Sequence, residues 1–136
     1  MRSRKSFKRF EHVEIVKGAG RGIKLGVPTI NFDTSRVNNL KEGIYVCRVF
    51  LPAPFWGVLH FGPRPTFGEG ERTLEVLLFD FENDGRVAGT ADIEIIDFIR
   101  EIIKFDSPQE MVKKIGRDVE AARAKISDFI GQKVST

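Results

Sequence analysis

The sequence predicts a mainly β fold, a small six-stranded antiparallel and Greek-key-like β-barrel with one long C-terminal α-helix packed on it. Three observations lead to this prediction. Six short segments alternate apolar and polar residues, with turn residues between them. One long segment near the end has apolar residues at helical spacing. The chain has 136 residues, 41% of them apolar, which suits a single domain with a real core.

The alternation is clearest in residues 43–51, where the odd-numbered positions from Tyr45 to Leu51 put four apolar side chains on one face. Glycine, proline and Asp-Gly signals separate the segments, so we expect a loop over residues 62–70 and a turn over residues 83–85. The six predicted strands are residues 11–17, 27–32, 43–51, 55–61, 73–81 and 90–99. Short strands at this spacing are typical of a small barrel.

Residues 108–130 carry the signals of a helix. Ser107 is a good N-cap, Pro108 fits the first helical position, and Glu110 completes a capping box. Gly131 is a suitable C-cap. The apolar residues at helical spacing are Met111, Val112, Ile115, Val119, Ala122, Ile126, Phe129 and Ile130. We expect this stripe to pack against the sheet, with a partner-binding helix as the alternative.

The positive charge is concentrated at the N-terminus. Residues 1–10 hold five cations and no acid, so the net charge of +3 becomes −2 over the remainder. We predict a basic tail over residues 1–10 and one domain over residues 11–131. A frayed terminus is the simplest interpretation of the tail, and an arm that binds nucleic acid or anionic lipid is the alternative.

The composition also excludes some classes of protein. No apolar run approaches the 18 residues of a membrane-spanning helix, and no signal-peptide core is present. Cys47 is the only cysteine, which excludes an internal disulfide and favours a small core residue. We expect a cytoplasmic protein.

A glycine-rich loop precedes the second predicted strand. Four glycines and two cations lie within residues 18–26, and Pro28-Thr29-Ile30-Asn31 follows. Backbone N–H groups can approach an anion closely here because glycine has no Cβ. The pattern is neither a P-loop nor a dinucleotide fingerprint, since β-branched residues follow it instead of a helix. A loop that binds phosphates, with Thr29 and Asn31 as oxygen donors to a hard metal ion, is one interpretation, and a flexible hairpin loop is the other.

Five segments, in order, resemble the riboflavin kinase (flavokinase) family. The first is Gly22-Ile-Lys-Leu-Gly-Val-Pro-Thr-Ile-Asn31, which is similar to a basic, glycine-rich arch followed by Leu-Gly-Phe-Pro-Thr-Ala-Asn. The others are Gly43-Ile44-Tyr45, Gly62-Pro63-Arg64-Pro65-Thr66-Phe67, Leu74-Glu75-Val76, and Ile99-Arg100 with Lys104-Phe105-Asp106-Ser107. The resemblance extends over residues 13–123 and implies the same barrel-and-helix architecture.

This resemblance implies an enzyme that transfers the γ-phosphoryl group of ATP to the 5′-hydroxyl of riboflavin, giving FMN and ADP. It implies that Thr29 and Asn31 contact Mg²⁺ and that Glu75 is the catalytic base. The implied nucleotide-binding residues are Gly18, Gly20, Arg21, Gly22, Lys24, Gly26, Pro28 and Thr29. The implied flavin-binding residues are Arg100, Lys104 and Phe105.

Glu75 lies within a predicted strand, and alternation puts Leu77, Phe79 and Phe81 on its face. Apolar neighbours raise the pKa of a carboxyl group, which suits a proton acceptor. We therefore expect a raised pKa at Glu75. On the residues alone, a glutamate on an ordinary solvent-facing strand position is the alternative.

Three positions depart from the family pattern, at His60, Ala88 and Ile102. They affect the flavin side, and we expect His60 to line the barrel. A non-catalytic flavin- or nucleotide-binding module on the same barrel is therefore an alternative function. A small nucleic-acid-binding barrel is a second alternative.

The expected partners are the small molecules riboflavin and ATP, with neither a membrane nor a nucleic acid, and the expected form is a monomer. Many bacterial relatives carry an FMN adenylyltransferase before this domain. This sequence has no room for one, so we expect the monofunctional form, which does not make FAD by itself. Either the native protein is short or this chain is an excised domain.

Overall fold

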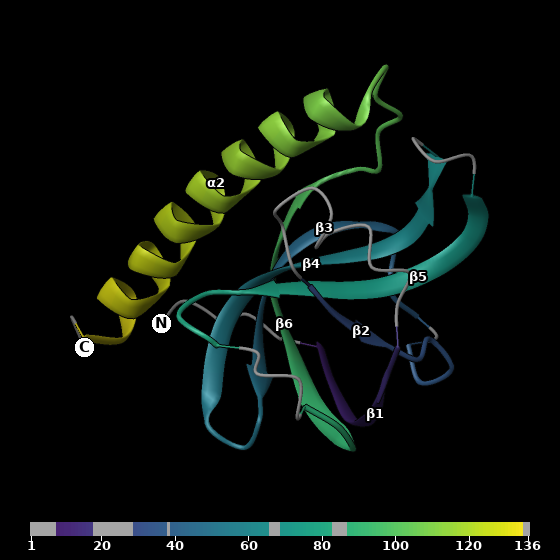
Figure 1. The fold of residues 1–136 in the computed structure, drawn as a ribbon. Coiled ribbons are helices and arrows are strands. Elements are labelled where there is room, and N and C mark those ends of the chain that lie inside the picture. Colours follow the sequence, from purple (N-terminus) through teal and green to yellow (C-terminus); the bar gives the residue numbers. More distant parts are fainter. Residues whose placement is uncertain (1–7, 18–28, 38, 66–68, 83–86, 135–136) are drawn as a thin grey trace.

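The structure is a computed structural model that describes residues 8–17, 29–37, 39–65, 69–82 and 87–134. Six strands and one helix follow one another along these described ranges (Figure 1). They are β1 (Lys8–Val16), β2 (Ile30–Phe32), β3 (Gly43–Phe50), β4 (Pro54–Arg64), β5 (Glu69–Leu78), β6 (Thr90–Arg100) and α2 (Pro108–Val134). No helix in these ranges is long and apolar enough to cross a membrane.

The strands form a closed barrel in the order β1-β2-β5-β4-β3-β6, and all neighbours are antiparallel. Strands β3, β4 and β5 are consecutive hairpins, and β6 returns to lie beside β3, which is a Greek key. The predicted fold class is therefore confirmed. Closure leaves no strand of the barrel as an unpaired edge.

The interior of the barrel is filled by one apolar cluster with residues from every strand, which we call the barrel core. On β3 the alternation works as predicted, because Tyr45, Cys47 and Val49 point inward. The buried members on the strands are Val13, Ile30, Phe32, Tyr45, Cys47, Val49, Leu59, Phe61, Leu74, Val76, Ala91, Ile93 and Ile95. The burial of Cys47 confirms it as a core residue.

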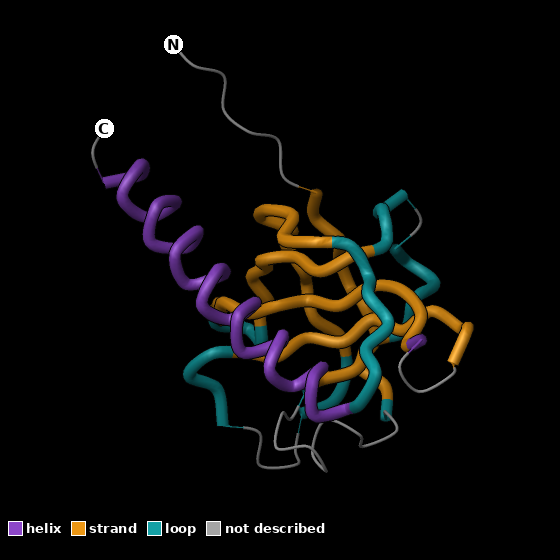
Figure 2. Tube along the Cα trace, turned by 90° about the horizontal axis from the view of Figure 1, so that it is seen from above, coloured by secondary structure: helices purple, strands orange, loops and turns teal. Residues whose placement is uncertain are grey.

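A second apolar cluster joins the outer wall of the barrel to α2, which runs along the outside of the barrel (Figure 2). Its buried members are Ile44, Val46, Val58, Phe79, Ile96, Ala122 and Ile126. The helix starts as predicted, because the Ser107 side chain accepts a hydrogen bond from the Glu110 N–H at 3.2 Å. The predicted C-cap at Gly131 is wrong, since the helix continues to Val134. A glycine inside an exposed helix costs only about 1 kcal/mol, so it does not force an end.

The β4–β5 hairpin is longer than predicted. The sequence predicts a loop over residues 62–70, but β4 extends to Arg64 and β5 starts at Glu69, and these two residues pair. The register shifts beyond Gly62, whose φ of +143° favours glycine. Such a bulge tolerates the proline that follows, so Gly62 and Pro63 lie in an irregular strand, while residues 66–68 of the predicted loop lie outside the described residues.

The last three residues of the predicted basic tail, 8–10, belong to β1, and Lys8 pairs with Ile95 of β6. Arg9 forms ion pairs with Asp92 at 3.0 Å and Glu94 at 3.4 Å. At least one cation of the tail is therefore neutralised by the barrel itself. The predicted turn over residues 83–85 lies outside the described residues.

Candidate active site

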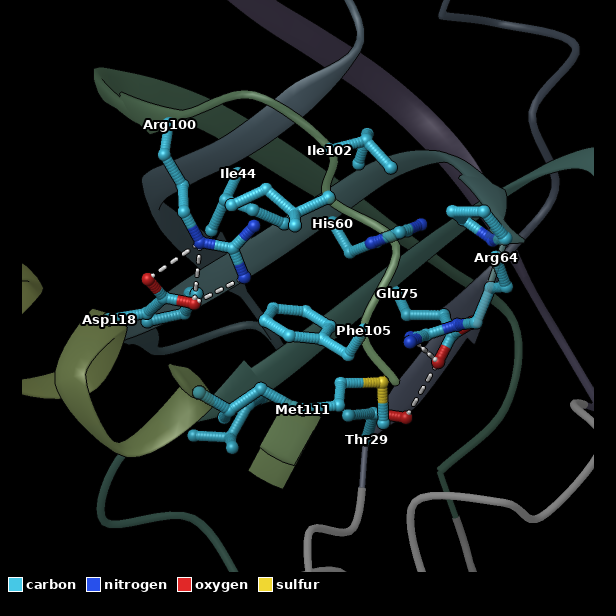
Figure 3. A pocket seen from close by; sticks show the side chains of 15 residues that line it. Thr29, Ile44, His60, Arg64, Glu75, Arg100, Ile102, Phe105, Met111 and Asp118 are labelled. Atoms are coloured by element: carbon cyan, nitrogen blue, oxygen red, sulfur yellow. Dashed lines mark hydrogen bonds and ion pairs between the residues drawn. The ribbon is translucent and has the colours of Figure 1, made fainter. Parts of the chain in front are cut away.

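A pocket opens between the outer wall of the barrel and the first half of α2 (Figure 3). The segment between β6 and the helix closes one side of it. Its cavity volume is about 70 Å³, and its mouth is open to solvent. Its lining residues are Thr29, Ile44, Val58, His60, Arg64, Pro65, Glu75, Leu77, Arg100, Ile102, Ile103, Phe105, Met111, Ile115 and Asp118.

A row of directly paired residues crosses five strands beneath this pocket. Asn31 of β2 pairs with Glu75 of β5, which pairs with His60 of β4. His60 in turn pairs with Ile44 of β3, which pairs with Arg100 of β6. Paired residues lie on the same face of a sheet. Their strand neighbours Leu74 and Val76 belong to the barrel core, so the row lies on the outer wall.

The carboxylate of Glu75 is surrounded by donors from three parts of the chain. Arg64 contacts both carboxylate oxygens, with Nε 2.7 Å from Oε2 and Nη2 2.5 Å from Oε1. The Thr29 hydroxyl donates to Oε1 at 3.2 Å, and the Thr73 hydroxyl donates to Oε2 at 3.0 Å. Only 13% of the Glu75 side chain and 14% of the Arg64 side chain are exposed. Charge-assisted bonds of this kind are short and strong.

The expected raised pKa of Glu75 is wrong. Burial does raise the pKa of the carboxyl group, but the hydrogen bond and charge of Arg64, with smaller contributions from His60 and Thr73, outweigh it. The net pKa of Glu75 lies below its ordinary value, so the group is ionised at neutral pH. The apolar neighbours on its own strand are also fewer than expected. Phe81 packs against the barrel core, because β5 ends at Leu78 and Asp80 turns the chain with a φ of 57°.

His60 faces the pocket instead of lining the barrel interior, which corrects the expectation from the sequence. Its position on β4 alternates with Leu59 and Phe61, and these two fill the barrel core. Its Nε2 lies 3.0 Å from the Gly62 carbonyl oxygen. Burial, followed by the nearby Arg64 charge, lowers the pKa of His60 to about 4. The imidazole is therefore neutral at pH 7, and the carbonyl favours the tautomer with hydrogen on Nε2.

At the other end of the row, Arg100 forms a buried ion pair with Asp118 of α2. Arg100 Nε donates to Oδ1 at 2.9 Å, and Nη2 donates to Oδ2 at 2.8 Å. The guanidinium carbon lies 5.7 Å from the centre of the Phe105 ring. The pocket thus brings together Arg100 and Phe105, two of the three predicted flavin-binding residues. The third, Lys104, is exposed and does not line the pocket.

Two of the three departures from the family pattern also fall at the pocket. His60 and Ile102 line it, and Ile102 packs against the position where Gly62 has no side chain. Ala88 is exposed and does not line it. Where this chain departs from the family pattern on the flavin side, it therefore has the neutral imidazole of His60 and the aliphatic side chain of Ile102.

The two predicted metal-binding residues share the side of the barrel on which Glu75 lies. Asn31 pairs with Glu75 across the sheet. Thr29 lies two residues before Asn31 and donates a hydrogen bond to Glu75. A hydroxyl and an amide oxygen are hard, neutral donors of the type that Mg²⁺ accepts together with water and phosphate oxygens. The donor set therefore fits a magnesium ion that arrives with a nucleotide. Within the described ranges, no three His, Cys, Asp or Glu side chains cluster as a metal site.

The remaining predicted nucleotide-binding residues lie outside the described residues. They are Gly18, Gly20, Arg21, Gly22, Lys24, Gly26 and Pro28. Their predicted role therefore stays a prediction. Thr29, which follows them directly, is the member of the set that the structure describes, and it lines the pocket.

Sequence reasoning misses three polar residues of this site, which are Arg64, Thr73 and Asp118. Arg64 stands inside one of the five family-like segments, but that segment alone does not predict its partner. Asp118 had a usable signal, because it lies seven residues after Met111 and on the buried side of the helix. An acid on an apolar helical stripe indicates a buried cationic partner.

Comparisons with known proteins agree with this site. The family model described as riboflavin kinase matches residues 7–126. The RNA-binding riboflavin kinase RibR of Bacillus subtilis is 38% identical over 120 residues, which cover 86% of this chain and 50% of that protein. The riboflavin kinase of Homo sapiens is 27% identical over 120 residues, which cover 83% of this chain and 77% of that protein.

A solved structure shares the fold. The crystal structure of a macrolide-efflux protein from Streptococcus pneumoniae superposes with a TM-score of 0.70 at 30% identity, covering 85% of this chain and 38% of that one. The chain spans half or less of the length of several curated relatives that it matches. Because the family model accounts for residues 7–126, which include every strand and most of the helix, the chain belongs to the riboflavin kinase family.

Proposed function

We propose that this chain transfers the γ-phosphoryl group of ATP to the 5′-hydroxyl of riboflavin, giving FMN and ADP. The observation that carries the proposal is the Glu75 carboxylate, which is ionised, held by three side chains and open to a pocket with apolar walls. Family membership supplies the reaction, and the pocket supplies a site of suitable chemistry. A pocket of this kind is the usual place for a small-molecule substrate.

In this proposal Glu75 accepts the proton of the riboflavin hydroxyl. The hydroxyl oxygen forms a bond to the γ-phosphorus, the bond from that phosphorus to the β–γ bridging oxygen breaks, and ADP leaves with the electron pair. The transition state of phosphoryl transfer is loose and asks little of the base strength. A carboxylate with a lowered pKa is therefore adequate, provided that it is ionised and correctly oriented.

The other predicted residues have roles around this carboxylate. Thr29 and Asn31 would hold Mg²⁺, which neutralises charge on the phosphates when bound. The glycine-rich segment over residues 18–28 would bind the triphosphate. Phe105 would pack against the isoalloxazine ring, and Arg100 would lie beside it. Lys104 does not line the pocket, so its predicted contact with the ligand would come from its exposed side chain outside the lining.

The test is chromatography of flavins after the purified chain is mixed with riboflavin, Mg²⁺ and ATP. We expect FMN from the wild type and a loss of roughly 10²–10⁴-fold in kcat for Glu75→Gln, the usual worth of a general base. Glu71→Gln is the matched control, because Glu71 is an exposed residue of the same strand. Riboflavin or ATP binding without FMN formation would support the non-catalytic module instead.

We also propose that the chain acts as a cytoplasmic monomer with small-molecule substrates. Light scattering on the purified protein tests the oligomeric state. Binding of an oligonucleotide at physiological salt would instead favour the nucleic-acid alternative. Loss of that binding when residues 1–7 are removed would then place it in the tail.

A further inference from the structure

Donor groups crowd the Glu75 carboxylate. A carboxylate offers about four lone-pair sites. Three hydrogen bonds occupy three of them, one from Thr29 to Oε1 and one each from Arg64 Nε and Thr73 to Oε2, and Arg64 Nη2 adds an ion-pair contact to Oε1. Oε1, which accepts one hydrogen bond, is therefore the oxygen that can accept a further one from a substrate hydroxyl.

Arg64 is the partner that fixes the plane of the carboxylate. Its guanidinium is a planar fork, and it reaches one oxygen through Nε and the other through Nη2. The two hydroxyls have single rotatable O–H groups and impose no plane. Because Arg64 Nε and Thr73 both donate to Oε2, that oxygen anchors the group, and Oε1 remains the oxygen available to the pocket.

The Arg64–Glu75 pair is not the sole connection between its two strands. Strands β4 and β5 are already joined by a ladder that runs from Gly57 and Leu78 to Arg64 and Glu69. Buried ion pairs are in general weak contributors to stability, because desolvation offsets their attraction. The Arg100–Asp118 pair differs, because it joins a strand of the barrel to a helix, and no strand ladder links these two elements.

Resting on the proposed function, we propose that Arg64 is a positioning residue that acts through Glu75. Its Nε bond to Oε2 holds the carboxylate in place, so that Oε1 is oriented toward the incoming hydroxyl. The bulge at Gly62 serves this arrangement, because it sets the end of β4 from which Arg64 reaches back to Glu75. The other charged or titratable groups around this pair are His60 on β4, Arg100 on β6 and Asp118 on α2.

The test is a double-mutant cycle on FMN formation with Arg64→Gln, Glu75→Gln and the double variant. A misplaced reacting group costs on the order of 10²-fold, so we expect Arg64→Gln to lower kcat by about that factor. The KM values for riboflavin and ATP should change little, because Arg64 is not assigned to either substrate. In the Glu75→Gln background, Arg64→Gln should have no further effect on kcat, since residues that act as a unit are not additive.

Two further variants sharpen the cycle. Arg64→Lys keeps the charge but loses the planar fork, so its kcat should lie between those of Arg64→Gln and the wild type. This variant also replaces Arg64→Gln in the cycle if Arg64→Gln does not fold. Arg72→Gln is the control, because Arg72 lies on β5 but is half-exposed and only 3.8 Å from Glu42 in a surface pair. Losses that add in the double variant, or an unchanged kcat in Arg64→Gln, would overturn the inference alone. A wild type that forms no FMN would overturn the proposed function and this inference with it.

Discussion

Asp118 of α2 forms an ion pair with the guanidinium of Arg100 at the end of β6, and the two side chains are only 3% and 14% exposed. Three hydrogen bonds of 2.8 to 3.2 Å join them. Arg100 also donates to the Glu101 carbonyl at 3.0 Å, which fixes the start of the segment that closes the pocket. One ion pair thus ties the helix, the barrel wall and the pocket closure together.

Replacement of Asp118 by asparagine should destabilise the protein markedly. It leaves the Arg100 charge buried without a counter-charge, and breaking a buried pair in this way costs about 3–5 kcal/mol. We expect a loss of about 3 kcal/mol, since the amide keeps one acceptor, measured as the free energy of unfolding in urea. Asp128→Asn, on an exposed part of the same helix, should leave that free energy unchanged. If Asp118→Asn lowers the free energy of unfolding no more than this control does, the Arg100–Asp118 pair is not needed for stability.

His60 should make stability depend on pH between about 4 and 6.5. The folded protein holds the pKa of His60 at about 4, below its ordinary value of 6.5. In that window the unfolded chain binds the proton first, so stability falls as the pH falls. At pH 5 the loss should reach about 2 kcal/mol, at 1.36 kcal/mol per pH unit.

Urea unfolding at pH 7.5 and pH 5 measures this effect. The His60→Asn variant should have a flatter dependence on pH than the wild type. His12→Asn is the control, because His12 is exposed on β1 and asparagine tolerates its positive φ of 55°. Equal slopes for wild type and His60→Asn would show that the folded protein does not exclude the proton.

Phe129→Ala should loosen the second half of α2 from the barrel. Phe129 packs edge-to-face on Trp56, with ring centroids 5.6 Å apart. Loss of a partly buried aromatic pair should cost about 2 kcal/mol. Trp56 is the only tryptophan, so its fluorescence should shift to longer wavelength. Ile130→Ala, at a neighbouring and 45% exposed position, should change neither the emission nor the unfolding midpoint.

Thr29→Val should weaken the use of Mg²⁺ while keeping the shape of the side chain. The hydroxyl is lost both as an oxygen donor to the metal and as a partner of Glu75. We expect the apparent affinity for Mg²⁺ to fall about tenfold, which is equivalent to 1.4 kcal/mol. Titration of FMN formation with Mg²⁺ at saturating ATP measures it, with Thr90→Val at an exposed position as the control. An unchanged Mg²⁺ midpoint would remove Thr29 from the metal site.

The fold could be predicted from the sequence because local patterns specify it. The alternation on β3 and the cap at Ser107 depend on residues next to one another in the chain, and both are confirmed. The length of the β4–β5 hairpin could not be predicted in this way. Gly62 and Pro63 indicate a turn when read alone, and only the pairing of β4 with β5 shows that they belong to a bulged strand.

The site could be predicted only in part, for a related reason. The position of Glu75 was predicted, but its pKa was misjudged, because the sequence shows the apolar neighbours on its own strand and not Arg64 on the next one. The same limit applies to His60, whose face depends on the register of β4. Cross-strand partners are tertiary facts, and no local pattern specifies them.

The proposed chemistry lies on the outside of the barrel, while the barrel core occupies the inside, and the two alternate along a single strand. On β5, Leu74 and Val76 point inward and Glu75 and Leu77 point outward. Inserting or deleting one residue there would exchange the two sets, carrying the carboxylate into the apolar interior. Conversely, the even-numbered positions of β5 can change among apolar side chains of similar volume without altering the lining of the pocket. Odd and even positions of this strand are thus free to evolve under separate constraints, one set by catalysis and the other by packing.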